Sequence, residues 1–124
     1  GIPYVLPIIV ALLTVNKDSL ILIENPESHL HPKGQTAIAE LMARAASFGA
    51  QIICESHSDH IINGVRVAVK EQIIDREKVT ISYYNKDVHL NTVATTIQID
   101  KNGNLDKYPS GLLDEWGNLM SRLI

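Results

Sequence analysis

The chain has 124 residues, of which 45% are hydrophobic and 20% are charged, and its formal net charge is −3. This length suits one domain, and the composition excludes a disordered chain and gives no reason to expect a nucleic-acid-binding surface. The single cysteine, Cys54, excludes an internal disulfide and suits a reducing, cytoplasmic setting. No signal-peptide pattern is present, and the apolar run over residues 5–15 is shorter than the roughly 20 residues that span a bilayer.

The chain begins at Gly1, inside an apolar segment. We therefore expect a piece whose N-terminal part is missing; a short protein that has lost its initiator Met is the alternative. Residues 3–15 are apolar nearly all round, which predicts a helix that is buried or covered by a partner. Pro3 and Pro7 fit such a helix only near its first turn.

A strand–helix–strand unit follows. Residues 19–23 are predicted to form a strand, and its apolar run is followed directly by Glu24. A short apolar run without polar alternation predicts a strand covered on both faces. Residues 33–48 show helical spacing of apolar side chains, and residues 50–55 predict a second strand. A unit of this length predicts parallel strands and a right-handed crossover, so Glu24 and His57 should emerge at one edge of the sheet.

The remaining elements are predicted from capping residues, alternation and turn signals. In chain order they are a helix over 59–72 capped by Ser58 or Asp59, strands over 78–84 and 92–100, a hairpin turn at Asn102-Gly103 with a return over 105–107, and a helix capped by Ser110 with Leu112, Leu113, Trp116, Leu119, Met120 and Leu123 on its apolar side.

Two stretches carry a family resemblance. LILIENPESHLHP, residues 20–32, resembles the Walker B segment and D-loop of ABC-type ATPases, whose pattern is four apolar residues, Asp, Glu, Pro, x, Ser, x, Leu, Asp. ICESHSDHIINGVR, residues 53–66, resembles their switch-histidine segment. The LHP and SHSDH parts of these stretches are most similar to bacterial ATPases described as AAA or ATPase-like, which are relatives of the RecF, SMC and overcoming-lysogenisation-defect ATPases.

The resemblance implies an α/β fold, namely part of a P-loop NTPase sheet of the ABC-ATPase head type. Three or four mostly parallel strands would be flanked by helices on both faces and followed by a C-terminal β-hairpin and helix. Residues 1–75 would form the core, and residues 76–124 the C-terminal strands, hairpin and helix. The implied partners are ATP with Mg²⁺, the missing N-terminal half, a second ATPase head, and nucleic acid through other parts of the parent, with no membrane.

Residue roles are carried over position by position. Glu24 takes the place of the metal-side acid and would hold Mg²⁺ through a water, while Asn25 takes the place of the catalytic Glu. His57 corresponds to the switch histidine, which would hydrogen-bond the γ-phosphate. The nucleotide and D-loop positions, some at the seam between two heads, are Ser28, His29, His31 and Ser56.

The sequence departs from the family pattern twice. No G-x-x-x-x-G-K-[ST] loop is present, so the phosphate cradle is absent and we expect no ATPase activity from residues 1–124 alone, only self-association through uncovered apolar surface. An amide cannot take a proton from water, so Asn25 can only orient it. Either hydrolysis is slow, or Glu27 or another carboxylate supplies the base.

Two other function classes remain open. His29, His31, His57 and His60, with nearby carboxylates, could form a metal-dependent hydrolase site, because imidazole and carboxylate suit zinc. Alternatively, an exposed sheet edge and an apolar first helix would make the chain a non-catalytic interaction module.

Overall fold

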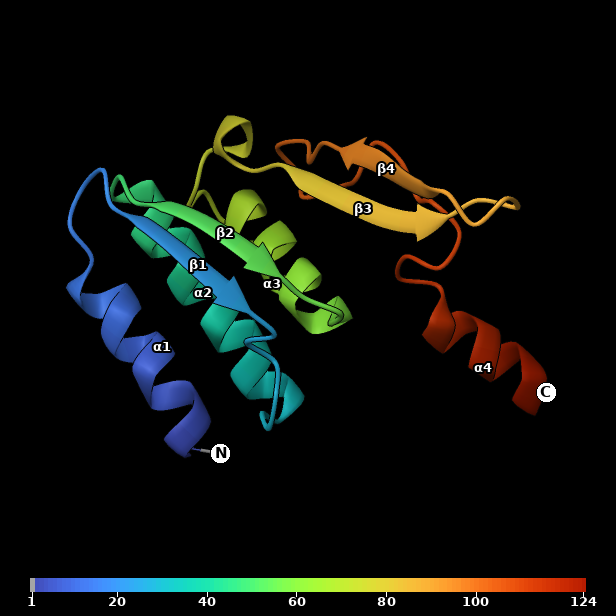
Figure 1. The fold of residues 1–124 in the computed structure, drawn as a ribbon, viewed down its shortest axis with the longest axis horizontal. Helices are drawn as coiled ribbons and strands as arrows, with labels where there is room; N and C mark the ends of the chain where they lie inside the picture. Colours follow the sequence, from blue (N-terminus) through green and yellow to red (C-terminus); the bar gives the residue numbers. More distant parts are fainter. Residues whose placement is uncertain (1) are drawn as a thin grey trace.

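The computed structural model describes residues 2–124 and has an α/β architecture (Figure 1). The predicted helices and the other predicted strands are present, with ends that shift by at most five residues, but the return over 105–107 forms only an isolated bridge at Leu105. In chain order they are α1 (Ile2–Thr14), β1 (Leu20–Glu24), α2 (Pro32–Ser47), β2 (Gln51–Glu55), α3 (Asp59–Lys70), the 3₁₀ turn η1 (Arg76–Lys78), β3 (Ile81–Lys86), β4 (Thr92–Ile97) and α4 (Glu115–Leu123).

The predicted strand–helix–strand unit is confirmed. β1 and β2 pair in parallel, with Leu20 opposite Gln51 and Glu24 opposite Glu55. His31 begins α2 as its N-cap, and its ring accepts a hydrogen bond from the Lys33 N–H group. Gly49 lies between α2 and β2 at φ 121°, a backbone conformation that glycine adopts without strain.

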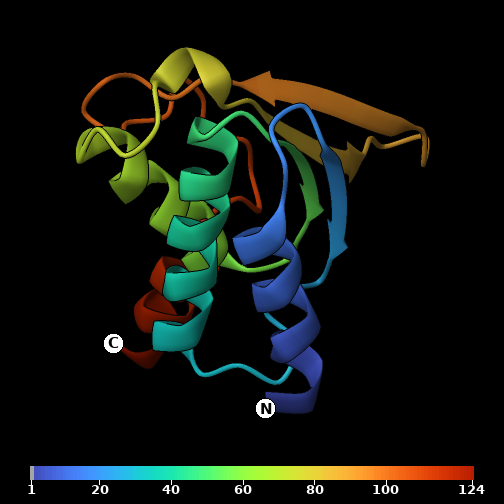
Figure 2. The ribbon, with the colours of Figure 1, turned by 90° about the vertical axis from the view of Figure 1, so that its left-hand side faces the viewer.

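The expectation of one mostly parallel sheet with helices on both faces is wrong. The described residues form two separate two-stranded sheets, because β3 and β4 pair with each other in antiparallel fashion and not with β1 or β2. Helices α1, α2 and α3 all lie on one side of the parallel pair (Figure 2). The antiparallel pairing of β4 agrees with the alternation of its sequence.

The outer face of the parallel pair is open, which also corrects the expectation that β1 is covered on both faces. Leu22 is 71% exposed, and its neighbours Leu20 and Ile53 are more than half exposed. Ile21 and Ile23 point the other way and pack with α1 and α2 in one of the two hydrophobic cores. The apolar run in β1 predicts that both faces of the strand are buried, but no described element of the chain covers the outer face.

Helix α1 is less buried than its composition suggests. Leu12 is buried in the core beneath β1, whereas Tyr4, Leu6 and Leu13 are more than half exposed. Pro7 lies inside the helix, beyond its first turn, where it cannot donate a backbone hydrogen bond. No helix among residues 2–124 combines the length and apolarity needed to cross a bilayer.

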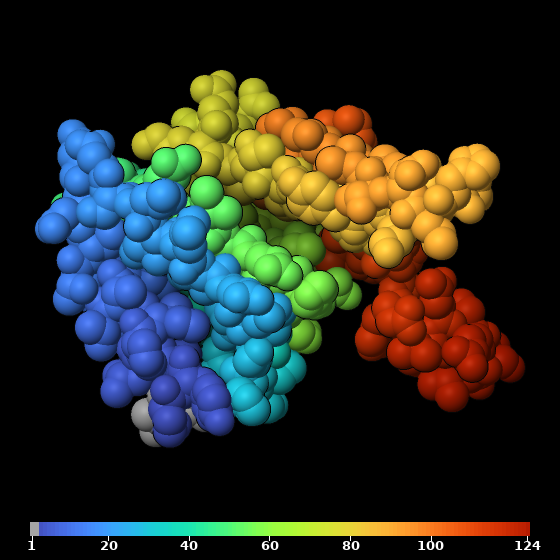
Figure 3. All heavy atoms as spheres, viewed as in Figure 1, coloured from blue at the N-terminus to red at the C-terminus, as the bar shows by residue number. Residues whose placement is uncertain are grey.

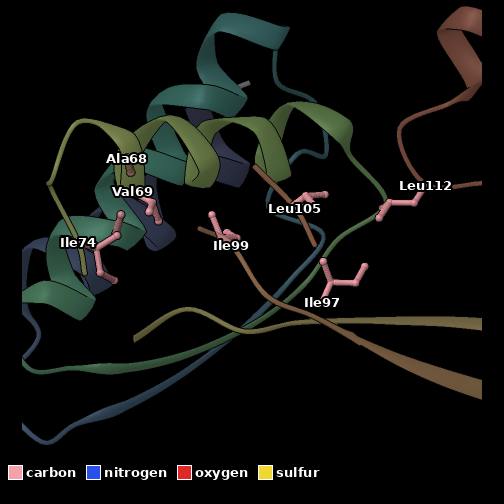
Figure 4. Close-up of a cluster of buried hydrophobic side chains, with 8 residues drawn as sticks. Ala68, Val69, Ile74, Ile97, Ile99, Leu105 and Leu112 are labelled. Atoms are coloured by element: carbon pink, nitrogen blue, oxygen red, sulfur yellow. The ribbon is translucent and has the colours of Figure 1, made fainter. Parts of the chain in front are cut away.

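The second hydrophobic core joins α3 to the C-terminal strands. Figure 4 shows Ala68 and Val69 on α3 above Ile97, Ile99 and Leu105 from the strand region. An isolated antiparallel bridge links Ile99 to Leu105 across the predicted Asn102-Gly103 turn. This core holds the antiparallel unit against the helical layer.

Helix α4 extends away from the rest of the molecule (Figure 3). None of its residues is buried, and the expected cap at Ser110 is wrong because the helix begins later. Its N-cap residue is Asp114, and left-handed backbone at Gly111 and Leu113 interrupts any earlier helical turn. Leu112 is buried in the second core, but it lies before the helix begins.

Candidate functional site

Two acids end the two parallel strands side by side. Glu24 and Glu55 are paired residues of the β1–β2 register, and the pairing continues one step further through an Asn25 N–H to Glu55 O bond of 2.9 Å. Because the strands are parallel, this edge collects both carboxyl ends. The edge at the carboxyl ends of the strands is the usual ligand-binding edge of open α/β sheets.

The chain turns sharply after β1. Asn25 has φ 49°, a left-handed conformation that Asn tolerates better than most residues. Pro26 is fully buried, and the Ser28 N–H donates to Asn25 O at 3.0 Å. This turn prevents Glu27 from continuing the strand direction and directs its side chain toward the loop that follows β2.

A hydrogen bond connects the two loops. Glu27 Oε1 accepts from the His57 backbone N–H at 2.8 Å, across 30 positions of sequence. The His57 ring lies 3.7 Å from Glu55 Oε1, measured from Nε2, and the two side chains are 81% and 64% exposed. A contact this exposed contributes little to stability, so the imidazole is available to a ligand.

Within residues 2–124, two buried oxygen atoms at this edge have no hydrogen-bond partner. They are Asn25 Oδ1 and Glu27 Oε2. An unsatisfied buried oxygen is costly, and it is relieved by a water, a cation or a donor group of a ligand. The thiol of Cys54 experiences the same negative environment: burial, and then the charges of Glu27 and Glu55, raise its pKa to about 11.

Helix α3 begins just after His57. Ser58 caps it by accepting from the backbone N–H groups of His60 and Ile61, as predicted for this residue. The Ser58 hydroxyl also bonds Gln35 Oε1, and Gln35 Nε2 donates to Leu30 O at 2.9 Å. Ser56 accepts from the Ser58 N–H at 3.0 Å, so its hydroxyl oxygen shapes the loop.

The segment that resembles a D-loop lies against the start of α1. His29 has φ 63°, and its ring stacks on Tyr4 with centroids 4.1 Å apart. His31 serves as the cap of α2, and Ser28 is exposed. These three residues therefore follow the acidic edge but do not converge on it as ligands of one ion.

The donor set at the edge fits Mg²⁺. Carboxylate and amide oxygens are available from Glu24, Glu27 and Asn25, and Mg²⁺ prefers few carboxylates and several waters. Among residues 2–124, no group of three or more His, Cys, Asp and Glu side chains is arranged to hold a metal ion directly. The hydrolase alternative, which needs His29, His31, His57 and His60 around one zinc, therefore has no support in this arrangement.

Three residues of the site escaped the sequence analysis. Glu55 ends β2 as Glu24 ends β1, so the parallel register itself could have revealed it. Gln35 bridges two loops from the first turn of α2, and Tyr4 stacks on His29 from α1. Neither contact has a local sequence signal, because each joins segments that are distant along the chain.

Two family comparisons match the chain. The family described as "AAA domain, putative AbiEii toxin, Type IV TA system" matches residues 2–63, which is half of the chain. The family described as "Protein of unknown function (DUF3696)" matches residues 74–123. No curated protein and no solved structure matches the chain. The first match spans β1, the turn after it, α2, β2 and the start of α3, and so includes the whole acidic edge.

Proposed function

The chain belongs to the AAA domain family, an ATPase-related family, and from this premise we propose that residues 20–58 form the metal-side part of a site that binds and hydrolyses ATP. One observation carries the proposal: parallel pairing brings Glu24 and Glu55 together while Glu27 bonds the backbone of His57. Acidic oxygens and an exposed imidazole thus share one strand edge, an arrangement that suits the positioning and charge neutralisation on which phosphoryl transfer depends.

Each residue has a distinct role in this proposal. Glu24, exposed at the end of β1, holds a water of the Mg²⁺ shell, and His57 donates a hydrogen bond to the γ-phosphate. When bound, Mg²⁺ neutralises charge on the phosphate oxygens. Asn25 orients the attacking water but cannot take its proton, so Glu27 is the candidate base. Its Oε2 atom is buried and lacks a hydrogen-bond partner among the described residues, so the attacking water has to enter this position to reach it.

The phosphate cradle has to come from outside the described residues. The β1–β2 pair has unpaired outer edges, and Leu20, Leu22 and Ile53 leave its outer face open. Two-stranded parallel sheets with an open apolar face are rare in isolation, because parallel strands are normally covered on both sides. We therefore propose that a nucleotide-binding segment N-terminal to residue 1 adds strands here, and that Ser28, His29 and His31 face a second head.

Metal binding provides a first test on the 124-residue chain itself. Mn²⁺, a paramagnetic substitute for Mg²⁺, should broaden the amide resonances of residues 24–27 and 55–57 before others. Glu24→Gln and Glu27→Gln should each weaken this broadening at least fivefold, whereas the matched variant Glu71→Gln, at the C-terminal end of α3, should leave it unchanged. Broadening spread evenly over all surface carboxylates would overturn the proposed metal side.

Hydrolysis is tested in a longer polypeptide that includes a phosphate-binding loop. There, His57→Ala should reduce turnover while Mg²⁺ binding is retained, and unchanged turnover would remove His57 from the site. Asn25→Glu addresses the identity of the base. A faster enzyme would indicate that a carboxylate at position 25 can take over proton transfer, whereas a loss of activity in Glu27→Gln alone would assign the base to Glu27.

A further inference from the structure

Five residues at the acidic edge form a closed ring of hydrogen bonds. Gln35 Nε2 donates to Leu30 O at 2.9 Å, and the Leu30 N–H donates to Glu27 O at 3.1 Å. Glu27 Oε1 then accepts from the His57 N–H at 2.8 Å. The peptide bond between His57 and Ser58 continues the ring, and the Ser58 hydroxyl closes it by donating to Gln35 Oε1. We call these five residues the edge ring.

The direction of the bonds made by Gln35 is set at Ser58. A serine hydroxyl has one proton and two lone pairs. Ser58 Oγ accepts from the backbone N–H groups of His60 and Ile61 at 3.1 and 3.3 Å, so its proton is left for Gln35. The oxygen of the Gln35 amide therefore faces Ser58, and its NH₂ group faces Leu30 O. This single orientation of the amide satisfies both neighbours.

Gln35 belongs to neither of the loops that it connects. It lies in the first turn of α2, where its backbone N–H already donates to His31 O at 3.1 Å. Its side chain instead bonds Leu30, in the loop after β1, and Ser58, the buried N-cap of α3. A side-chain amide that bonds both loops from a helix fixes how far apart the two loops lie.

The two loops carry the two groups that have to stay together at this edge. The His57 ring is 81% exposed, so the backbone of residues 57–58 determines where the imidazole lies. Glu27 comes from the other loop, and its Oε2 atom is buried. The edge ring joins the two loops. Displacing a group of a reactive site by about 1 Å can lower its rate on the order of 100-fold.

We propose that Gln35 is a positioning residue of the acidic edge, which acts through Leu30 and Ser58 to hold Glu27 and His57 at a fixed separation. The use of that separation in hydrolysis rests on the proposed function. The coupling of Gln35 to the His57 backbone rests on the hydrogen bonds of the edge ring alone. Loss of the Gln35 side chain should therefore loosen one loop while the rest of the fold is retained.

Hydrogen exchange of two amides tests the proposal in the 124-residue chain. The His57 N–H belongs to the edge ring, whereas the Asn25 N–H donates to Glu55 O at 2.9 Å as an extension of the β1–β2 pairing. Gln35→Met removes both side-chain bonds. It should speed exchange of the His57 amide about fivefold relative to the Asn25 amide, the equivalent of one ordinary hydrogen bond. Equal acceleration of both amides, or no change in either, would overturn the proposal.

A second variant changes one bond of the edge ring and nearly preserves its shape. Gln35→Glu keeps an acceptor toward Ser58 but places an oxygen against Leu30 O, which can only accept. The same relative acceleration of the His57 amide is expected. The matched control Gln51→Glu makes the same charge change at the exposed start of β2, and it should leave the ratio of the two exchange rates unchanged. An equal effect of Gln51→Glu would assign the result to charge and overturn the proposal.

Mn²⁺ broadening connects the edge ring to the metal side. In Gln35→Met, the broadening at residue 57 should fall relative to that at residue 24, since paramagnetic broadening declines steeply with distance. An unchanged ratio would overturn the fixed separation of the two loops. The two proposals fail differently. Absence of broadening at residues 24–27 in the unsubstituted chain would overturn the proposed function, whereas unchanged exchange of the His57 amide in Gln35→Met would overturn the role of Gln35.

Discussion

Helices α2 and α3 approach each other closely at Gly64, which makes a sharp prediction for Gly64→Ala. A Cβ built at this position of α3 would lie 2.6 Å from Ala39 Cβ and 3.3 Å from both Cα and O of Thr36. The nearest atoms belong to a methyl group and to backbone of α2, which cannot rotate away. The two helices must therefore separate, and Ala39 is fully buried between them.

Two opposing terms set the magnitude. Forcing an extra methyl into a packed core costs about 1–3 kcal/mol. Replacing a helical glycine by alanine recovers about 1 kcal/mol of helix propensity. We expect a net loss of up to about 2 kcal/mol in the free energy of unfolding, which for a chain of this size lowers Tm by up to about 8 °C. Urea and thermal unfolding followed by far-ultraviolet circular dichroism measure both quantities.

The same substitution elsewhere provides the control. A Cβ at Gly34, in the first turn of α2, meets only Leu30 side-chain atoms at 3.6 Å or more, so Gly34→Ala should be neutral or stabilising by up to about 1 kcal/mol. In a double-mutant cycle, Ala39→Gly should partly rescue Gly64→Ala because it removes the opposing methyl. If Gly64→Ala matches Gly34→Ala in stability, the inferred contact between α2 and α3 is refuted.

Two further predictions concern single groups, and a third concerns the activity of the whole chain. Because the pKa of Cys54 is raised to about 11, chiefly by burial, iodoacetamide at pH 8 should alkylate the native thiol roughly 100-fold more slowly than the unfolded one; equal rates would contradict this. Hydrogen bonds from Asn104 and Asn102 lower the pKa of Asp100, so its contribution to stability is present above the unfolded pKa and is lost as pH falls below about 4. Urea midpoints between pH 5 and 2 should therefore vary less in Asp100→Ala. Finally, the 124 residues with ATP and Mg²⁺ should release no phosphate above background, and turnover abolished by Glu24→Gln would show that no further segment is needed.

Part of the site could be anticipated from the order of residues alone. An apolar run ending in Glu24, a helical stripe and a second run before His57 predict a parallel unit, and parallel strands bring their carboxyl ends to one edge. The Ser58 cap and the Asn102-Gly103 turn followed from local hydrogen-bonding chemistry, and both are present. The bond between Glu27 and the His57 N–H group could not be anticipated, because it depends on how the Asn25 turn aims one side chain across 30 positions.

The sequence by itself determined the elements of this protein and the edge where its acids gather, since both follow from periodicity, capping and chain direction. Only the tertiary structure decided which apolar faces have partners. Leu22 lies in a strand expected to be covered on both faces, yet it is exposed. Trp116 lies on the apolar side of the last helix, and no described element covers it. β3 pairs with β4 instead of extending the parallel sheet. The local sequence shows that a face of a helix or strand is apolar. Which surface covers that face is determined by contacts between segments that are distant along the chain, or by another chain.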